Sequence, residues 1–100
     1  MIVETLTFRL ADGVDDDAFL TADRRVQTEF AYRQPGLLRR TVARSTGAGG
    51  SSEWIVIDLW ASAADADACD ARWAADPAAA EFMACVDAAS VRAARYETLD

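Results

Sequence analysis

The chain has 100 residues, which is enough for one domain with a modest hydrophobic core. Its formal net charge of −7 disfavours nucleic acid and anionic membranes as partners, because both are recognised through clustered positive charge. The chain lacks histidine, lysine and asparagine, which excludes a histidine-based triad, a histidine metal site, a Schiff-base lysine and a P-loop lysine.

The sequence also favours a cytoplasmic protein. No apolar run approaches the roughly 18 residues of a membrane span, and the N-terminus lacks the basic region of a signal peptide. Cys69 and Cys85 would lie about 24 Å apart on one straight helix, which is beyond the reach of a disulfide. We therefore expect two free, partly buried thiols in a reducing compartment.

The first part of the chain predicts a strand and then a helix. Residues 2–10 alternate loosely between apolar and polar side chains, as in a strand. Residues 15–33 predict a helix that begins at an aspartate cap. Its buried stripe consists of apolar side chains at helical spacing, namely Phe19, Ala22, Val26 and Phe30. Asp23 and Gln27 border this stripe, so they lie either on the surface or at the rim of a pocket.

A second strand is predicted over residues 37–44, after a turn at Pro35-Gly36. Its arginines indicate an edge strand, where charge discourages aggregation. Alternation places Leu38, Arg40, Val42 and Arg44 on one side and Leu37, Arg39, Thr41 and Ala43 on the other. Residues 45–52 form a glycine-rich hairpin loop that matches no phosphate-binding pattern.

The most hydrophobic stretch, residues 54–60, predicts a strand that is covered on both faces. One face carries Trp54, Val56, Asp58 and Trp60, and the other carries Ile55, Ile57 and Leu59. Both faces are largely apolar, so each requires a covering layer. The two faces therefore predict a central position for this strand.

An Ala-rich helix and a last strand complete the chain. Ser62 and Asp65 have the spacing of a capping box and start the helix. Asp76-Pro77 restarts it with a cap residue and a proline at the first position, so a kink or break is expected there. Residues 90–99 alternate as a strand.

The element order βαββαβ predicts an α+β, ferredoxin-like single domain over residues 1–100. Its four-stranded antiparallel sheet carries both helices on one face, because the two crossovers are right-handed. The opposite face would then expose apolar side chains of the central strand. We therefore expect a homodimer that packs through this open sheet face.

The chain contains three short motifs in an order known from another family: Pro35-Gly36-Leu37-Leu38, Leu59-Trp60-Ala61-Ser62 and Ala75-Asp76-Pro77. With the element order, they make the chain resemble the antibiotic biosynthesis monooxygenase group of the dimeric α/β-barrel superfamily. The resemblance implies a homodimer with a pocket between helices and sheet in each subunit. Members oxidise polyketide aromatics without a cofactor, degrade haem, or have no known reaction.

The resemblance can also be followed at single positions. Trp60 stands where the polyketide-oxidising members have an active-site tryptophan, whereas Val56, Ala66 and Met83 replace their asparagine, tyrosine and arginine. Trp73 matches a tryptophan of the haem-degrading members, but no histidine is present to ligate haem iron. The resemblance implies a small hydrophobic substrate, no cofactor and no metal, with Trp60 in a catalytic position and Trp73 and Met83 against the substrate.

Asp58 is the most informative single residue. An acid in the middle of an apolar strand must be paired, solvated in a cavity or shifted in pKa. Its partner could be an arginine of a neighbouring strand, with Arg39, Arg40, Arg92 and Arg95 as candidates. Asp58 is therefore either one half of an ion pair or the acid or base of a pocket. Glu4, on the face of Leu6 and Phe8, is expected to form a salt bridge.

Three hypotheses about function follow. The first is a cofactor-independent oxygenase or related enzyme, with Asp58 or the Asp23 and Gln27 pair as proton acceptor. The second is a non-catalytic homodimer that binds a hydrophobic metabolite. The third is an accessory dimer without a pocket. Trp60 and Trp73 are core aromatics if the third hypothesis holds and pocket walls if either of the others does.

Overall fold

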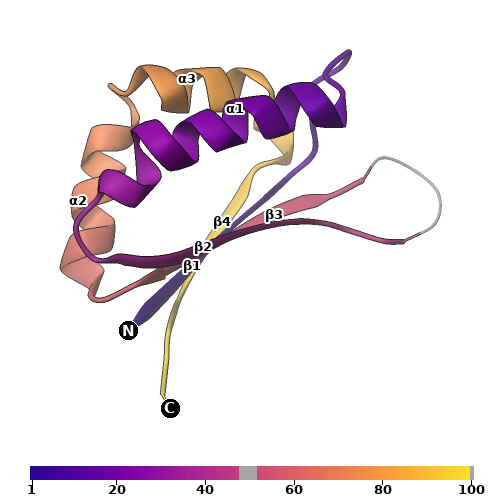
Figure 1. The fold of residues 1–100 in the computed structure, drawn as a ribbon. Helices are drawn as coiled ribbons and strands as arrows, with labels where there is room; N and C mark the ends of the chain where they lie inside the picture. Colours follow the sequence, from indigo (N-terminus) through magenta and orange to yellow (C-terminus); the bar gives the residue numbers. More distant parts are fainter. Residues whose placement is uncertain (48–51, 100) are drawn as a thin grey trace.

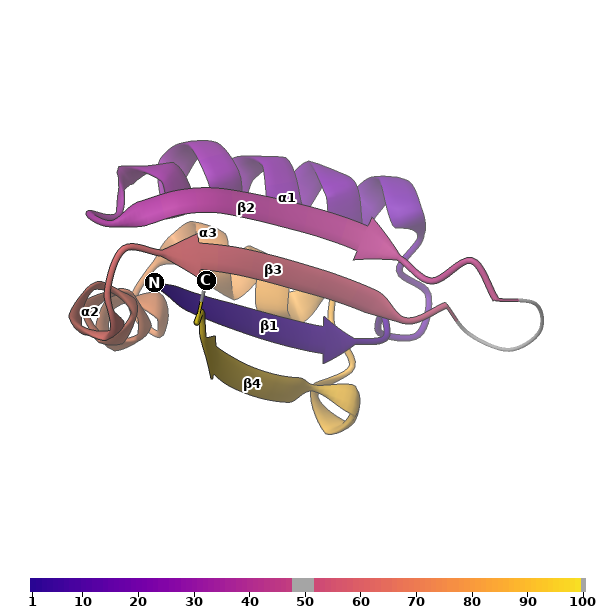
Figure 2. The same cartoon turned by 90° about the horizontal axis from the view of Figure 1, so that it is seen from below.

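A computed structural model describes residues 1–47 and 52–99 of the chain. The strands are β1 (Ile2–Phe8), β2 (Leu37–Arg44), β3 (Trp54–Trp60) and β4 (Arg92–Glu97), and the helices are α1 (Asp16–Glu29), α2 (Ala63–Trp73) and α3 (Pro77–Ala84). The 3₁₀ turns η1 (Ala31–Arg33) and η2 (Ala88–Ser90) precede β2 and β4. Within the described residues the strands form one antiparallel sheet in the order β2-β3-β1-β4 (Figures 1 and 2). The predicted ferredoxin-like α+β fold is confirmed.

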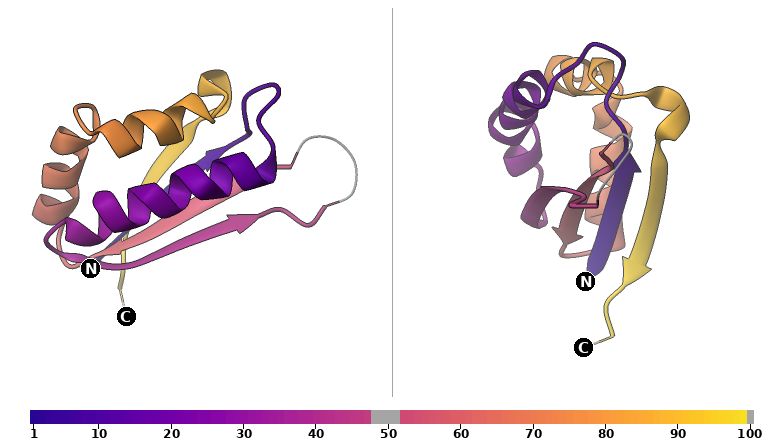
Figure 3. Two further views of the ribbon diagram at one scale, coloured as in Figure 1. Left: turned by 45° about the horizontal axis from the view of Figure 1, so that its top comes forward. Right: turned by 90° about the vertical axis from the view of Figure 1, so that its right-hand side faces the viewer.

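The helices cover one face of the sheet in two orientations (Figures 1 and 3). α1 and α3 run side by side above the sheet, whereas α2 stands at one end of it. The break between α2 and α3 lies at the predicted site, where the carboxylate of Asp76 accepts a hydrogen bond of 2.8 Å from the backbone N–H of Ala79. Pro77 takes the first helical position. The predicted caps at Asp15 and Ser62 are also confirmed.

α1 is shorter than the sequence predicts. Phe30 leaves the helical conformation, with φ −132° and ψ −66°, and the chain continues as η1 instead of extending α1 to Arg33. The turn brings the ring of Phe30 edge-on to Trp73, with 5.5 Å between the ring centroids. Phe30 is buried, as its place in the predicted stripe requires, so its burial gave no signal of the helix end.

β2 differs from its predicted alternation at its first residues. The pairing with β3 shifts register between Leu37 and Arg39, so Leu37 pairs with Trp60 on the helix-facing side. Leu38, which was predicted to share a face with Arg40, is 53% exposed. An irregularity of this kind adds one residue to a strand and re-aims the side chains beside it.

The core lies between the helices and the sheet. β3 contributes Trp54, Val56 and Trp60 to it, while the alternate residues Ile55 and Ile57 lie on the opposite, open face. The larger cluster of buried residues consists of Phe8, Phe19, Val26, Ala31, Trp54, Val56, Ala78, Phe82 and Val86. The predicted alternation and central position of β3 are therefore confirmed, and a cover for its second face stays a prediction.

The structure also bears on the predictions about the cysteines, the glycine-rich loop and membrane spans. Cys69 and Cys85 are free, as expected. The glycine-rich loop falls partly on residues 48–51, which lie outside the described residues. In the described part of the chain, no helix has the length and apolar character needed to cross a membrane.

Candidate functional site

A cavity of about 500 Å³ lies between the sheet and the helices. Its walls are mainly apolar and come from every layer of the fold, with Phe30, Leu37, Val56, Trp60, Trp73 and Phe82 among the lining residues. This size is typical of pockets for small organic ligands. α2 stands at one end of the sheet, and α1 ends before Phe30 (Figure 1). Residues of both regions therefore line the cavity.

Charged residues cross the sheet beneath this cavity in a single row. Asp58 of β3 pairs in register with Arg40 of β2 and with Glu4 of β1, and Glu4 pairs in register with Arg95 of β4. All four residues line the cavity. Because directly opposite residues of antiparallel strands share a face, the row Arg40–Asp58–Glu4–Arg95 forms a charged floor under apolar walls.

The floor places two carboxylates next to each other. The Asp58 side chain is 20% exposed and its nearest cation is Arg40, with 3.5 Å between Oδ1 and Nη1. Burial, together with the negative charge of Glu4, outweighs Arg40 and raises the pKa of Asp58 to about 6. Asp58 therefore exchanges its proton near neutral pH, as a general base requires.

Arg40 is held from the side of α1. Its side chain is 4% exposed, and its Nη2 donates to Asp23 Oδ1 at 2.7 Å. Gln27, one turn further along α1, donates to the other oxygen of Asp23 at 2.7 Å. Asp23 is itself 2% exposed and does not line the cavity. Asp23 and Gln27 therefore position Arg40. Both were candidates for the rim of the pocket, but neither lines the cavity.

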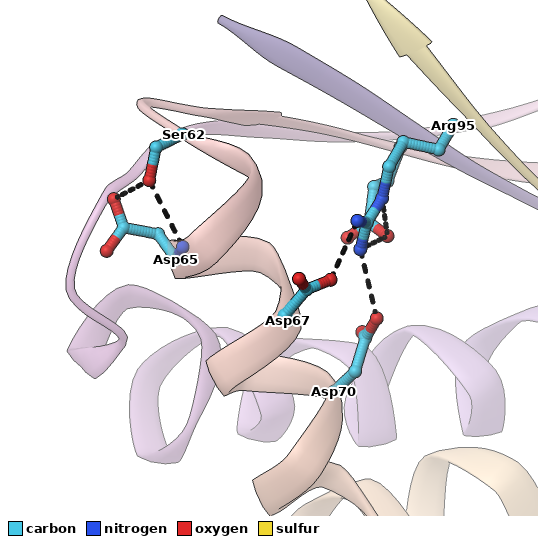
Figure 4. A network of polar contacts seen from close by, with 6 residues as sticks. Ser62, Asp65, Asp67, Asp70 and Arg95 are labelled. Carbon is cyan, nitrogen blue, oxygen red and sulfur yellow. Dashed lines mark hydrogen bonds and ion pairs between the residues drawn. The ribbon is translucent and has the colours of Figure 1, made fainter.

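Arg95 closes the other end of the row (Figure 4). Its guanidinium lies 3.0 Å from Glu4, 2.7 Å from Asp67 and 3.3 Å from Asp70. The two aspartates project from α2, so Arg95 ties β4 to this helix at the edge of the cavity. Nearby, Ser62 caps α2 through the backbone N–H of Asp65.

The structure gathers some of the predicted site residues and separates others. Asp58, Trp60 and Trp73 line the same cavity. Met83 does not line it; it lies with Trp73 and Ala79 at a second, smaller depression on the helical layer. Met83 was predicted at the substrate because it stands where the family pattern has an arginine. In this structure that position lies on α3, which begins after the break, and not at the cavity.

Other functional residues were not assigned to the site from the sequence. Arg40 and Arg95 were considered only as partners of Asp58, and Cys69 only as a thiol, yet all of them line the cavity. Alternation alone placed Arg40 on the same side as Val42. Alternation does not predict the strand register, and it is the register that places Arg40 opposite Asp58.

Two buried donors in the cavity walls have no acceptor among the described residues. They are the indole N–H of Trp60 and the Nε–H of Arg40. Buried polar groups are normally hydrogen-bonded, so each unpaired donor raises the free energy of the folded state, and neither nitrogen has surface that a ligand in the cavity could touch. Cys69, by contrast, is a poor nucleophile, because burial and the neighbouring carboxylates raise its thiol pKa to about 12.

The described residues hold no group of three or more cysteine, aspartate or glutamate side chains placed to bind a metal ion. The residues that line the cavity can transfer a proton at Asp58 and stack a flat ligand on the aromatic walls.

No protein-family model and no curated protein matches the chain. Solved structures match it over almost its full length. SnoaB, a cofactor-independent oxygenase from Streptomyces nogalater, is 18% identical with a TM-score of 0.78, over 99% of this chain and 93% of SnoaB. A dimeric ferredoxin-like protein from an uncultured marine organism is 14% identical with a TM-score of 0.77, over 99% and 95%. An antibiotic biosynthesis monooxygenase is 13% identical with a TM-score of 0.71, over the whole of both chains. The chain thus has the fold of the antibiotic biosynthesis monooxygenase-like proteins, as its motifs indicated.

Proposed function

We propose that the protein is a cofactor-independent oxygenase that acts on a small aromatic molecule bound in the cavity. One observation carries the proposal. Asp58, a carboxylate with a pKa of about 6, lines an apolar cavity of about 500 Å³. Such a group accepts a proton near neutral pH. The similarity in fold to SnoaB supports the assignment.

The reaction begins with transfer of a proton from an acidic hydroxyl or an enolisable methylene group of the substrate to Asp58. The resulting anion is electron-rich enough to reduce O₂ without a cofactor. At a methylene carbon, consumption of one O₂, formation of a carbonyl group and release of one water balance atoms and electrons. No external reductant is required.

The cavity walls would orient the substrate for this step. Trp60 and Trp73 offer aromatic surfaces for stacking. Asp23 and Gln27 act through Arg40, which they hold in place. Met83 lies outside the cavity and has no role in this step.

The proposal includes a homodimer through the open sheet face. Ile55, Ile57 and Leu59 of β3 lie on this face, and Val3 of β1 pairs in register with Leu59. Apolar side chains gathered on one open face are typical of an interface. The similar protein from an uncultured marine organism is dimeric. A second copy packed sheet against sheet would cover these residues.

Anthrone tests the enzymatic proposal, because it is aromatic and carries an enolisable methylene group. Purified protein in air-saturated buffer should consume O₂ and form anthraquinone, with a rate that rises as Asp58 ionises through pH 6. Asp58→Asn should lower kcat/KM by about 100-fold or more, the usual contribution of a general base. Asp12→Asn is the matched control, since Asp12 is exposed and lies outside the cavity.

An Asp58→Asn variant that oxidises anthrone as fast as the parent protein would refute the assignment of Asp58. The ion pair with Arg40 favours a second candidate, a non-catalytic binding protein in which Asp58 is structural. Under that alternative, anthrone binds in the cavity but the rate of O₂ consumption stays at that of buffer alone.

A further inference from the structure

Arg40 lies between two carboxylates and is held more closely by one of them. Its Nη2 donates to Asp23 Oδ1 at 2.7 Å, whereas its Nη1 lies 3.5 Å from Asp58 Oδ1. A charge-assisted hydrogen bond between a guanidinium and a carboxylate is normally about 2.7–2.9 Å long, so only the contact with Asp23 is of full strength. The cation nearest to Asp58 is therefore engaged mainly by another acid.

The surroundings of Arg40 maintain this unequal division. The side chains of Arg40 and Asp23 are both buried, so water and salt screen their attraction weakly. Gln27 donates to the second oxygen of Asp23 at 2.7 Å and fixes the orientation of that carboxylate on α1. The Nε–H of Arg40 is unpaired among the described residues, so the guanidinium has a donor in reserve. Released from Asp23, Arg40 would have the donors for a closer contact with Asp58.

The other charged groups around Asp58 do not replace Arg40. The remaining titratable residues that line the cavity come from β1, β4 and α2, and they are Glu4, Arg95, Cys69 and Asp70. Glu4 raises the pKa of Asp58 by repulsion, and Arg95 pairs with Glu4 and with two aspartates of α2. η1 and α3 contribute apolar side chains. Among the described residues of the cavity wall, Arg40 is thus the one cation that pairs with Asp58.

We propose that Asp23 is a positioning residue, which holds the guanidinium of Arg40 back from Asp58 and thereby leaves Asp58 able to accept a proton. The inference rests on the proposed role of Asp58 as the base of the cavity. An Arg40 that closed on Asp58 with two hydrogen bonds would stabilise the carboxylate and lower its pKa, so the site would lose its base near neutral pH. The charge of Asp23 also raises the pKa of Asp58 directly. Asp23 therefore affects the chemistry of the cavity without lining it.

Asp23→Asn tests the inference. The substitution keeps the size of the side chain and removes its charge, so Arg40 should turn towards Asp58. The pKa of Asp58, followed by NMR through its carboxyl carbon, should fall from about 6 by about one pH unit or more. The pH profile of anthrone oxidation should move down with it. Asp17→Asn, a matched change at an exposed residue of α1 outside the cavity, should leave both in place. A pKa of Asp58 that is unchanged or higher in Asp23→Asn overturns the inference.

The parent protein supplies a second test, which does not depend on the folding of the variant. Crystal structures at pH values below and above the pKa of Asp58 should both show the close contact between Arg40 and Asp23. A guanidinium that leaves Asp23 and closes on Asp58 at the higher pH overturns the inference.

The titration also separates this inference from the proposed function, because it requires no turnover. If Asp23→Asn lowers the pKa of Asp58 in a protein that does not oxidise anthrone, the positioning of Arg40 stands and the oxygenase is refuted. If the parent protein oxidises anthrone and the pKa of Asp58 ignores Asp23→Asn, the inference alone is refuted.

Discussion

At the scale of single residues, the buried carboxylate of Asp58 should lower the free energy of unfolding when it is ionised. The pKa of an aspartate in an unfolded chain is about 3.9, and burial raises that of Asp58 to about 6. The folded protein therefore binds more protons than the unfolded chain between these two pH values, so its stability falls as the pH rises through this range. Above pH 6 the ionised carboxylate costs on the order of 3 kcal/mol.

Asp58→Asn should accordingly stabilise the protein. The free energy of unfolding should rise by up to about 3 kcal/mol at pH 7 to 8 and be nearly unchanged below pH 4, where the aspartate is neutral in both states. Arg40 also lies 2.7 Å from Asp23, so it should still have a carboxylate partner in the variant. Urea unfolding at several pH values measures the difference, with Asp12→Asn as the control. A variant that is no more stable than the parent at pH 8 would contradict the account of Asp58.

At the scale of elements, the junction between η1 and β2 depends on Gly36. Its φ of +85° lies in the left-handed region, which side chains disfavour, and a Cβ atom there would overlap the carboxylate of Asp65 in the first turn of α2. Gly36 thus lets the chain pass close to the capped start of α2. Gly13 has a similar φ of +79°, but its surroundings are open.

This pair of glycines gives a matched prediction. Gly13→Ala should cost about 1 kcal/mol through its backbone conformation alone, whereas Gly36→Ala should cost roughly 1–3 kcal/mol more through the overlap with Asp65. Thermal and urea unfolding measure both changes. Adding Asp65→Ala to Gly36→Ala should recover part of the loss. Equal costs for the two glycine variants would show that the close approach has no energetic consequence.

At the scale of the whole molecule, the open sheet face should decide the oligomeric state. Ile57→Asp places a charge at the centre of β3 on this face, where a partner sheet would bury it. The variant should sediment as a monomer at concentrations where the parent protein is a dimer. Ala71→Asp, at an exposed position of α2, is the control and should not change sedimentation. A parent protein that sediments as a monomer would contradict the proposed interface.

The fold could be predicted from the sequence because its signals are local. The caps at Asp15, Ser62 and Asp76 and the alternation of residues 54–60 each depend on neighbouring residues only. The floor of the cavity depends on register between strands that are distant in sequence, which periodicity does not encode. Asp58 and Trp60 line the cavity together because alternation within residues 54–60 puts them on one face, whereas Met83, taken from its place in the family pattern, lies outside the cavity.

β4 has a consequence for how a ligand enters and leaves. Every residue of this strand is exposed in the single chain, and β4 pairs with β1 alone at the edge of the sheet. A strand with so little buried apolar surface opens locally at low cost. Because Ala93, Ala94 and Arg95 line the cavity, each opening would uncover it from the side. Backbone amides of β4 should therefore exchange with deuterium faster than those of β3, and slow down when the cavity is filled. The strand that contributes least to the core would then set the rate at which ligands come and go.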